Sequence, residues 1–269
     1  MIRASHPGPS IAITAMIVLL AATAQPRGQH LVVFALAALL GEFSIGWSND
    51  AFDADRDAAA GRTDKPIPAG AIGRAAVFVA ATGALVVSTV LAFLVTVPTG
   101  VIHLVMMAAG WAYNAGLKST PASALTYAVG FGLIPVFAAS TLPGSPLPKA
   151  WTAGAAALLG VGAHFVNVLP DLEGDRIGGV RGLPQRVAEW RAGPVTVRLI
   201  ALALLVAASG LIVFGPGPPY TWPFLAGFGL TAVLALVGAA APGRVPFLIA
   251  IAIAAIDVVL FAASHAALV

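Results

Sequence analysis

The stretch GWSNDAFDADRDAAAGRTDKPIPAG, residues 46–70, carries five aspartates and three basic residues between Asp50 and Lys65. Only 9% of the 269 residues in the chain are charged, so this concentration of acid does not fit its surroundings. A hydrophobic run ends where the stretch begins. Either the stretch is an ordinary solvated loop or it is a binding site, and the rest of the sequence bears on that choice.

The surrounding sequence is typical of a membrane protein. The chain is 59% hydrophobic and its mean hydropathy is +0.95, whereas a soluble domain usually has about 25% charged residues. The apolar residues occur in long runs, as in helices that cross a bilayer. Strands of a β-barrel would be shorter and would alternate. The sequence therefore predicts an all-α integral membrane protein.

We predict nine transmembrane helices in one bundle, with residues 1–269 forming a single membrane domain. The spans are expected at residues 10–24, 30–48, 75–97, 99–117, 120–141, 149–169, 195–214, 220–241 and 245–267. The first span also has features of a cleaved signal peptide, since a basic residue and an apolar run precede Ala22-Thr23-Ala24. The distribution of basic residues between the two sides of the membrane, described next, favours a transmembrane span over a signal peptide.

The basic residues fall mainly on one side of this predicted topology. With the N-terminus in the cytoplasm, every Lys and Arg except Arg27 and Lys149 lies on the inner side. This predicts a multi-pass protein of the cell membrane with cytoplasmic Asp-rich loops. It also explains the pI of 9.7 without nucleic acid as a partner. The chain has no cysteine, which excludes disulfides, thiol catalysis and Cys-ligated metals.

Nine of the eleven acidic residues lie in two cytoplasmic segments, each of which begins at the end of a span. The second segment contains NVLPDLEGD and, like the first, precedes a basic stretch with a proline. Both share the pattern N-x3-D-x3-D, formed by Asn49, Asp53 and Asp57 in the first segment and by Asn167, Asp171 and Asp175 in the second. The shared pattern suggests an internal repeat in which the second and sixth spans correspond.

Residues four positions apart lie on one side of an α-helix. If each helix continues past its apolar run, each motif forms a stripe of oxygen-bearing side chains, with Asp50 at the edge of the first. Pro170 predicts a kink near the second. Carboxylates this close repel one another unless a cation lies among them, and their oxygens suit Mg²⁺. We therefore expect two facing stripes to hold Mg²⁺ and, through it, a diphosphate.

Basic residues near both motifs are candidates for binding the remaining charge of that diphosphate. They are Arg62, Lys65, Lys118, Arg181 and Arg186. The simpler interpretation is that both segments are solvated loops, as a single acidic loop between helices usually is. Two loops that share one spacing and hold nearly all the acid favour a site.

Four segments resemble those of a known family. NDAFDADRD fits an N-D-x-x-D-x-x-x-D pattern, and KPIPAG resembles the R-P-I-P-S-G segment that follows it. DLEGD fits a second Asp-rich motif, and YNAGLK, from Tyr113 to Lys118, looks like the Tyr/Lys segment between the motifs. Over nearly its whole length the chain resembles the UbiA superfamily of intramembrane prenyltransferases. It departs at Lys65, where many members have Arg, while Asn167 stands where members vary.

The resemblance implies a helical bundle whose central cavity opens toward the cytoplasm. A polyprenyl diphosphate would bind through Mg²⁺, its allylic C–O bond would ionise, and the carbocation would alkylate an aromatic or quinone-precursor acceptor, or a lipid one. The implied metal ligands are Asn49, Asp50, Asp53, Asp57, Asn167, Asp171 and Asp175, and the implied catalytic residues among them are Asp50, Asp53, Asp171 and Asp175.

Apolar walls would exclude water from such a cation, and aromatic faces would stabilise it. The aromatic residues near the appropriate helix ends are Phe43, Trp47, Phe52, Tyr113, Phe131 and Phe165. Glu42 lies two turns before Asn49 on nearly the same face. An acid within a membrane helix is a functional hypothesis by default, so Glu42 either contacts the acceptor or is hydrogen-bonded between helices.

Other polar residues leave their roles open. His164 and Asn114 either contact substrate or pack helices together. Structural roles are expected for His103 and for Asp257. Within the motifs, Asp55 and Glu173 occupy middle positions; Asp55 lies off the stripe and is expected to be solvated or to support the ligands, whereas Glu173 is undecided.

Three other functions compete with prenyl transfer. A terpene cyclase on the same scaffold would ionise the same substrate but capture the cation with its own chain. A transporter would suit the intramembrane acids Glu42 and Asp257, although most of the acid lies at the cytoplasmic end rather than the midplane. A CDP-alcohol phosphotransferase would need a D-G…A-R…G…D…D pattern, which the sequence lacks.

Overall fold

The computed structural model describes residues 1–5, 7–23, 28–190, 193–216, 221–243 and 245–264, and no strand occurs among them. The chain divides into two compact units. Unit 1 comprises Met1–Gly116 and Phe137–Pro146, and unit 2 comprises Leu117–Val136 and Leu147–Val269. The predicted end of the first span at 24, the predicted start of the eighth at 220, the predicted end of the last at 267, and Arg27, Arg191 and Arg244 lie outside the described residues.

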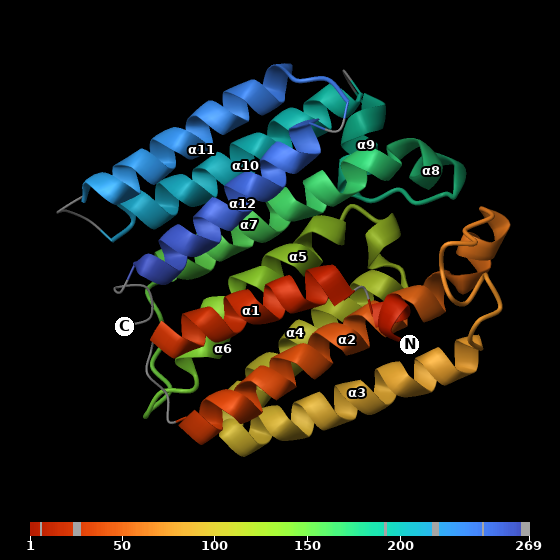
Figure 1. The fold of residues 1–269 in the computed structure, drawn as a ribbon, viewed down its shortest axis with the longest axis horizontal. Helices are drawn as coiled ribbons and strands as arrows, with labels where there is room; N and C mark the ends of the chain where they lie inside the picture. The colour runs from red at the N-terminus through yellow and green to blue at the C-terminus, as the bar shows by residue number, and fades with distance from the viewer. Residues whose placement is uncertain (6, 24–27, 191–192, 217–220, 244, 265–269) are drawn as a thin grey trace. The chain divides into compact units, whose positions relative to one another are not determined.

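Unit 1 is built around one long helix. Its elements are η1 (Ile2–Ser5), α1 (Pro7–Thr23), α2 (Gly28–Ala59), α3 (Arg74–Val95) and α4 (Val97–Ala115). α2 packs against α1, α3 and α4, and α3 runs back along α2 (Figure 1). Gly41 permits a close approach of α2 to α4, because an added Cβ would lie 2.8 Å from His103 Cε1. His103 Nε2 lies 3.0 Å from Ser88 Oγ, a contact between α4 and α3 that fits its expected structural role.

Unit 2 contains the remaining helices except α6 (Ile134–Ala139), which has residues in both units. Its elements are η2 (Leu117–Ser119), α5 (Ser123–Gly132), α7 (Ala150–Val168), η3 (Leu169–Asp171), α8 (Leu172–Ile177), α9 (Leu183–Trp190), α10 (Pro194–Phe214), α11 (Trp222–Ala240) and α12 (Val245–Ala263). α7 packs against α5 and α10, and α10 packs against α11 and α12 (Figure 1). Ser209 of α10 donates a hydrogen bond to the buried Asp257 of α12. This contact fits the structural role expected for Asp257.

Six helices in the described part of the chain are long and apolar enough to cross a membrane. Large apolar side chains face outward on them, as on α3, where Val79 is 70% and Leu94 68% exposed. The predicted span 120–141 is not one helix, because α5 ends at Gly132 and α6 (Ile134–Ala139) follows. Pro135 explains the break, since it donates no backbone hydrogen bond and disfavours helical geometry before it. The count of nine spans, the single domain and the central cavity remain predictions.

Candidate functional site

The first Asp-rich motif lies on an extension of α2. This helix continues to Ala59, well past its apolar run, as the i, i+4 spacing requires. Asp50, Asp53 and Asp57 are buried, with 2%, 6% and 6% of their surface exposed. Asp55 points away, since 87% of its side chain is exposed. Asp50, Asp53 and Asp57 therefore form a buried stripe on α2, beside which the predicted member Asn49 is half-buried, and Asp55 lies outside it.

Basic side chains contact each of these buried carboxylates. Lys65 Nζ lies 3.1 Å from Asp50 Oδ1 and 2.7 Å from Asp57 Oδ2, while Arg56 Nη2 lies 2.7 Å from Asp53 Oδ2. Burial disfavours the charged form of Lys65, but its hydrogen bond to Asp57 and the charge of Asp50 outweigh this and raise the pKa of Lys65. Lys65 is therefore a stable cation within the motif. Sequence reasoning missed Arg56, although its i, i+3 spacing from Asp53 signals the pair.

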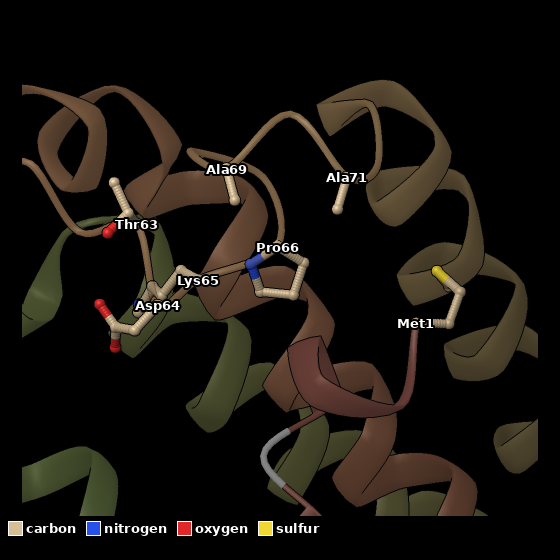
Figure 2. Close-up of a pocket in the computed structure, with 7 residues that line it drawn as sticks. All are labelled: Met1, Thr63, Asp64, Lys65, Pro66, Ala69 and Ala71. Atoms are coloured by element: carbon tan, nitrogen blue, oxygen red, sulfur yellow. The ribbon is translucent and has the colours of Figure 1, made fainter.

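The loop between α2 and α3 borders an open pocket. Its volume is about 490 Å³, and its lining includes Thr63, Asp64, Lys65 and Pro66, with Met1 across from them (Figure 2). Arg62 is exposed and donates two hydrogen bonds to Asp64, at 3.0 and 3.1 Å. The hydrogen bond from Arg62 lowers the pKa of the exposed Asp64. Arg62 and Lys65 thus lie on one loop beside the buried stripe.

Other predicted site residues of unit 1 lie along α2 and α4. Glu42 and Asn49 are half-buried on α2, and no hydrogen bond or ion pair joins the Glu42 carboxylate to another described residue. Phe43 and Trp47 have ring centroids 5.6 Å apart, and Trp47 Nε1 donates to the Met1 carbonyl at 3.1 Å. Tyr113 is half-buried near the end of α4. The hydrogen bond between helices that was the alternative role for Glu42 is therefore absent among the described residues.

An aromatic cluster that the sequence did not predict as a unit lies beside the motif. Phe52 of α2 meets Phe78 of α3 and Trp111 of α4, with centroid separations of 5.8 and 6.2 Å. Phe52 was a candidate because it lies near the appropriate end of its helix. Phe78 and Trp111 gave no comparable signal, because an aromatic residue in an apolar span is ordinary core.

Asn114 connects two helices. It is 4% exposed, and its amide nitrogen donates to the Ile45 carbonyl at 2.9 Å and to Ser48 Oγ at 2.8 Å. Both donors of the amide are therefore used between α4 and α2. These contacts favour the structural alternative for Asn114.

The second motif differs in local geometry from the first. α7 ends at Val168, the 3₁₀ turn η3 contains Pro170, and α8 begins at Leu172. The interruption matches the kink expected at the proline. Asn167 and Asp171 are exposed and Asp175 is half-buried, so these oxygens do not form a stripe on one straight α-helix.

Gln185 is a polar neighbour of the second motif that sequence reasoning missed. It is 5% exposed on α9, and its Nε2 donates to Asp175 Oδ2 at 2.8 Å. This bond fixes one carboxylate oxygen and so orients the other. A single glutamine in a basic stretch carries no signal for this contact, because it depends on how α9 folds against α8.

The basic candidates of unit 2 have different environments. Lys118 of η2 is 8% exposed. Arg181 is exposed and pairs with Glu189 at 2.7 Å, and Arg186 Nε donates to the Arg181 carbonyl at 2.8 Å. Both arginines thus lie on the α8–α9 connection and the start of α9, in the unit that carries the second motif.

His164 anchors the segment before α9. It is 1% exposed, its Nε2 lies 3.0 Å from Ser123 Oγ, and its ring stacks on Tyr127 with centroids 4.5 Å apart. Ser123 Oγ also accepts from the Leu183 backbone N–H at 2.9 Å. These contacts join α5, α7 and the start of α9, and they favour the helix-packing alternative for His164.

Removing the contact of Gln185 is expected to weaken metal use at the second motif. We expect Gln185→Leu to raise the Mg²⁺ concentration for half-maximal turnover about tenfold, because a hydrogen bond to a charged group stabilises by about 1.5–3 kcal/mol. Exposed Glu189→Gln on the same helix should stay within about twofold of the parent. Equal Mg²⁺ requirements in all variants would contradict a positioning role for Gln185.

The oxygen donors of the first motif fit Mg²⁺. No group of three or more His, Asp or Glu side chains converges as a metal site within the described ranges. However, the carboxylates of Asp50 and Asp57 already share one cation, the ammonium of Lys65. Asp53 and the amide of Asn49 follow the same helix face, and hard oxygen ligands of this kind suit Mg²⁺.

Comparison with known proteins identifies relatives. The model of the UbiA prenyltransferase family matches residues 10–242. The apo structure of a UbiA homolog from Aeropyrum pernix K1 aligns with a TM-score of 0.74 at 19% identity, covering 96% of this chain and 97% of that one. A UbiA homolog from Archaeoglobus fulgidus bound to GPP and Mg²⁺ aligns with a TM-score of 0.70 at 15% identity, covering 96% of each chain. A structure of digeranylgeranylglyceryl phosphate synthase has a TM-score of 0.69 at 16% identity, covering 97% of this chain and 94% of that one. No significant match was found among curated protein sequences.

Proposed function

Because the chain belongs to the UbiA prenyltransferase family, we propose that it transfers a prenyl group from a polyprenyl diphosphate to an aromatic or quinone-precursor acceptor. A lipid acceptor is the alternative within this reaction. The observation that carries the proposal is the buried stripe of Asp50, Asp53 and Asp57 on the extension of an apolar helix. The A. fulgidus homologs bound to GPP and Mg²⁺ and to DMAPP and Mg²⁺ support the same donor class and metal.

In the proposed reaction the allylic C–O bond breaks, and its electron pair leaves with the diphosphate. Bound Mg²⁺ would neutralise the charge that develops on the leaving group. The ligands proposed to hold it are Asn49, Asp50, Asp53 and Asp57 in the first motif and Asn167, Asp171 and Asp175 in the second. The residues proposed to bind the diphosphate are Arg62, Lys65, Lys118, Arg181 and Arg186.

The acceptor is proposed to bind deeper along α2. Its π electrons form the new C–C bond with the cation, and the substituted carbon then loses a proton. Glu42 lies about 10 Å deeper than Asn49, by the rise of seven helical residues, and can orient the acceptor or take up that proton. Phe43, Trp47 and Tyr113 are proposed to line this region. We place both motifs, and the N-terminus, on the cytoplasmic side of a nine-span single domain.

Product analysis tests this function directly. Purified full-length protein is given a panel of prenyl diphosphates with Mg²⁺, with and without aromatic, quinone-precursor and lipid acceptors, and its products are identified by mass spectrometry. Prenylated acceptor is the expected result. Cyclic hydrocarbon or alcohol formed without any acceptor would instead establish a terpene cyclase. Mg²⁺-dependent release of diphosphate would argue against a transporter.

A further inference from the structure

A single ammonium group bridges two carboxylates of the first motif. Lys65 Nζ lies within 3.1 Å of both Asp50 and Asp57, and 15% of the Lys65 side chain is exposed. The two aspartates are seven residues, or about two turns, apart on α2. Lys65 therefore bridges Asp50 and Asp57, the first and last carboxylates of the stripe, and it does so through oxygens that are proposed to bind Mg²⁺.

We propose that Lys65 is an internal counter-ion that competes with the divalent metal for Asp50 and Asp57, so that metal binding displaces its ammonium. The inference rests on the proposed function, since that function places the metal at these carboxylates. It gives Lys65 a role before substrate binds, in addition to the later contact with diphosphate.

The chemistry of the two cations supports an exchange. Buried carboxylates that lie close together need a positive charge to offset their repulsion, and Lys65 supplies it. A divalent ion carries twice that charge and binds the same oxygens, whereas an ammonium and a metal ion repel each other at such distances. Lysine suits the exchange better than arginine, because it is a point charge on a flexible stem rather than a rigid fork.

The loop gives the displaced side chain a place to move. Lys65 lines the open pocket of about 490 Å³ together with Thr63, Pro66 and Ala69 (Figure 2). A rotation about its side-chain bonds can carry the ammonium from the stripe toward this opening without refolding α2. Once released there, it is available to a diphosphate bound at the metal.

Metal binding by substrate-free protein tests the exchange. Purified full-length Lys65→Met, which removes the ammonium with its hydrogen bonds and keeps an unbranched apolar chain, is titrated with Mn²⁺ by electron paramagnetic resonance and with Mg²⁺ by calorimetry. We expect about tenfold tighter binding than in the parent, because the competing cation is gone. Without divalent ions the variant should melt at a lower temperature, and Mg²⁺ should raise that temperature more than it does in the parent.

Two further variants keep the result interpretable. Arg74→Gln removes an exposed ion pair between α3 and α2, Arg74 Nη1 to Asp55 Oδ2 at 2.8 Å, and should leave metal affinity unchanged. Lys65→Arg keeps the positive charge, so it should bind metal no more tightly than the parent. This comparison can still be made if Lys65→Met does not fold. Equal or weaker binding by folded Lys65→Met, or tighter binding by Lys65→Arg, would overturn the exchange. If the parent itself bound no metal and released no diphosphate, the proposed function would fail instead.

Discussion

Asp53→Asn is expected to lower Mg²⁺-dependent release of diphosphate from a prenyl diphosphate by about a thousandfold, which corresponds to about 4 kcal/mol of lost transition-state stabilisation. Asp53 lies in the middle of the buried stripe on α2. Asparagine keeps the shape of the side chain but removes the negative charge that binds a metal ion. Release is measured on purified protein at saturating Mg²⁺, beside a melting temperature that reports retention of the fold.

Asp55→Asn is the matched control, because it makes the same chemical change two residues away. Asp55 is solvent-exposed and contacts only the exposed Arg74 among the ion pairs described, and such surface pairs contribute little. We expect its turnover to stay within about twofold of the parent. If Asp53→Asn were as active as Asp55→Asn, the buried stripe on α2 would not be the metal site.

The contrast between these two aspartates shows which features a sequence predicts well. Helical periodicity is a local property, so the spacing of Asn49, Asp53 and Asp57 sufficed to place Asp53 and Asp57 on a buried face and to exclude Asp55. The same periodicity depends on α2 continuing beyond its apolar run, which it does. Length and hydropathy likewise predicted an all-helical chain, because a bilayer permits few other structures.

Features that depend on chain breaks or on tertiary contacts were harder to predict. The apolar composition of residues 120–141 does not show where a helix ends. In the structure this run forms two helices, α5 and α6, with the break just before Pro135. Lys65 was expected to face a diphosphate, but whether its flexible side chain contacts aspartates depends on the path of the loop. The bond from Gln185 to Asp175 joins two helices, and no pattern along the chain encodes it.

The second motif raises a sharper question, because its exposure resembles that of a solvated loop. Asp171 is exposed within a 3₁₀ turn, whereas its counterpart by pattern, Asp53, is buried on a regular helix. A carboxylate that binds a metal only together with substrate has no need of burial beforehand, since the metal and diphosphate supply its partners. The exposure of Asp171 therefore does not show whether it is a metal ligand or a solvated aspartate. Substitution of Asp171 distinguishes the two.

Asp171→Asn is expected to lower Mg²⁺-dependent diphosphate release by about a hundredfold to a thousandfold, and to raise the Mg²⁺ concentration that half-maximal turnover requires. Because the side chain is exposed, the melting temperature should change little, so the loss cannot be attributed to unfolding. Glu173→Gln is the matched control in the same segment. Its carboxylate is exposed and pairs with Arg176 at 2.7 Å.

The two variants separate the interpretations of the second motif. If Asp171 binds metal, Asp171→Asn loses activity while Glu173→Gln stays within about twofold of the parent. Similar losses in both would indicate a general electrostatic effect of an acidic surface, which high salt should weaken through screening. Full activity in both would restrict the metal chemistry to the buried stripe on α2, where the Asp53 and Asp55 variants remain the test.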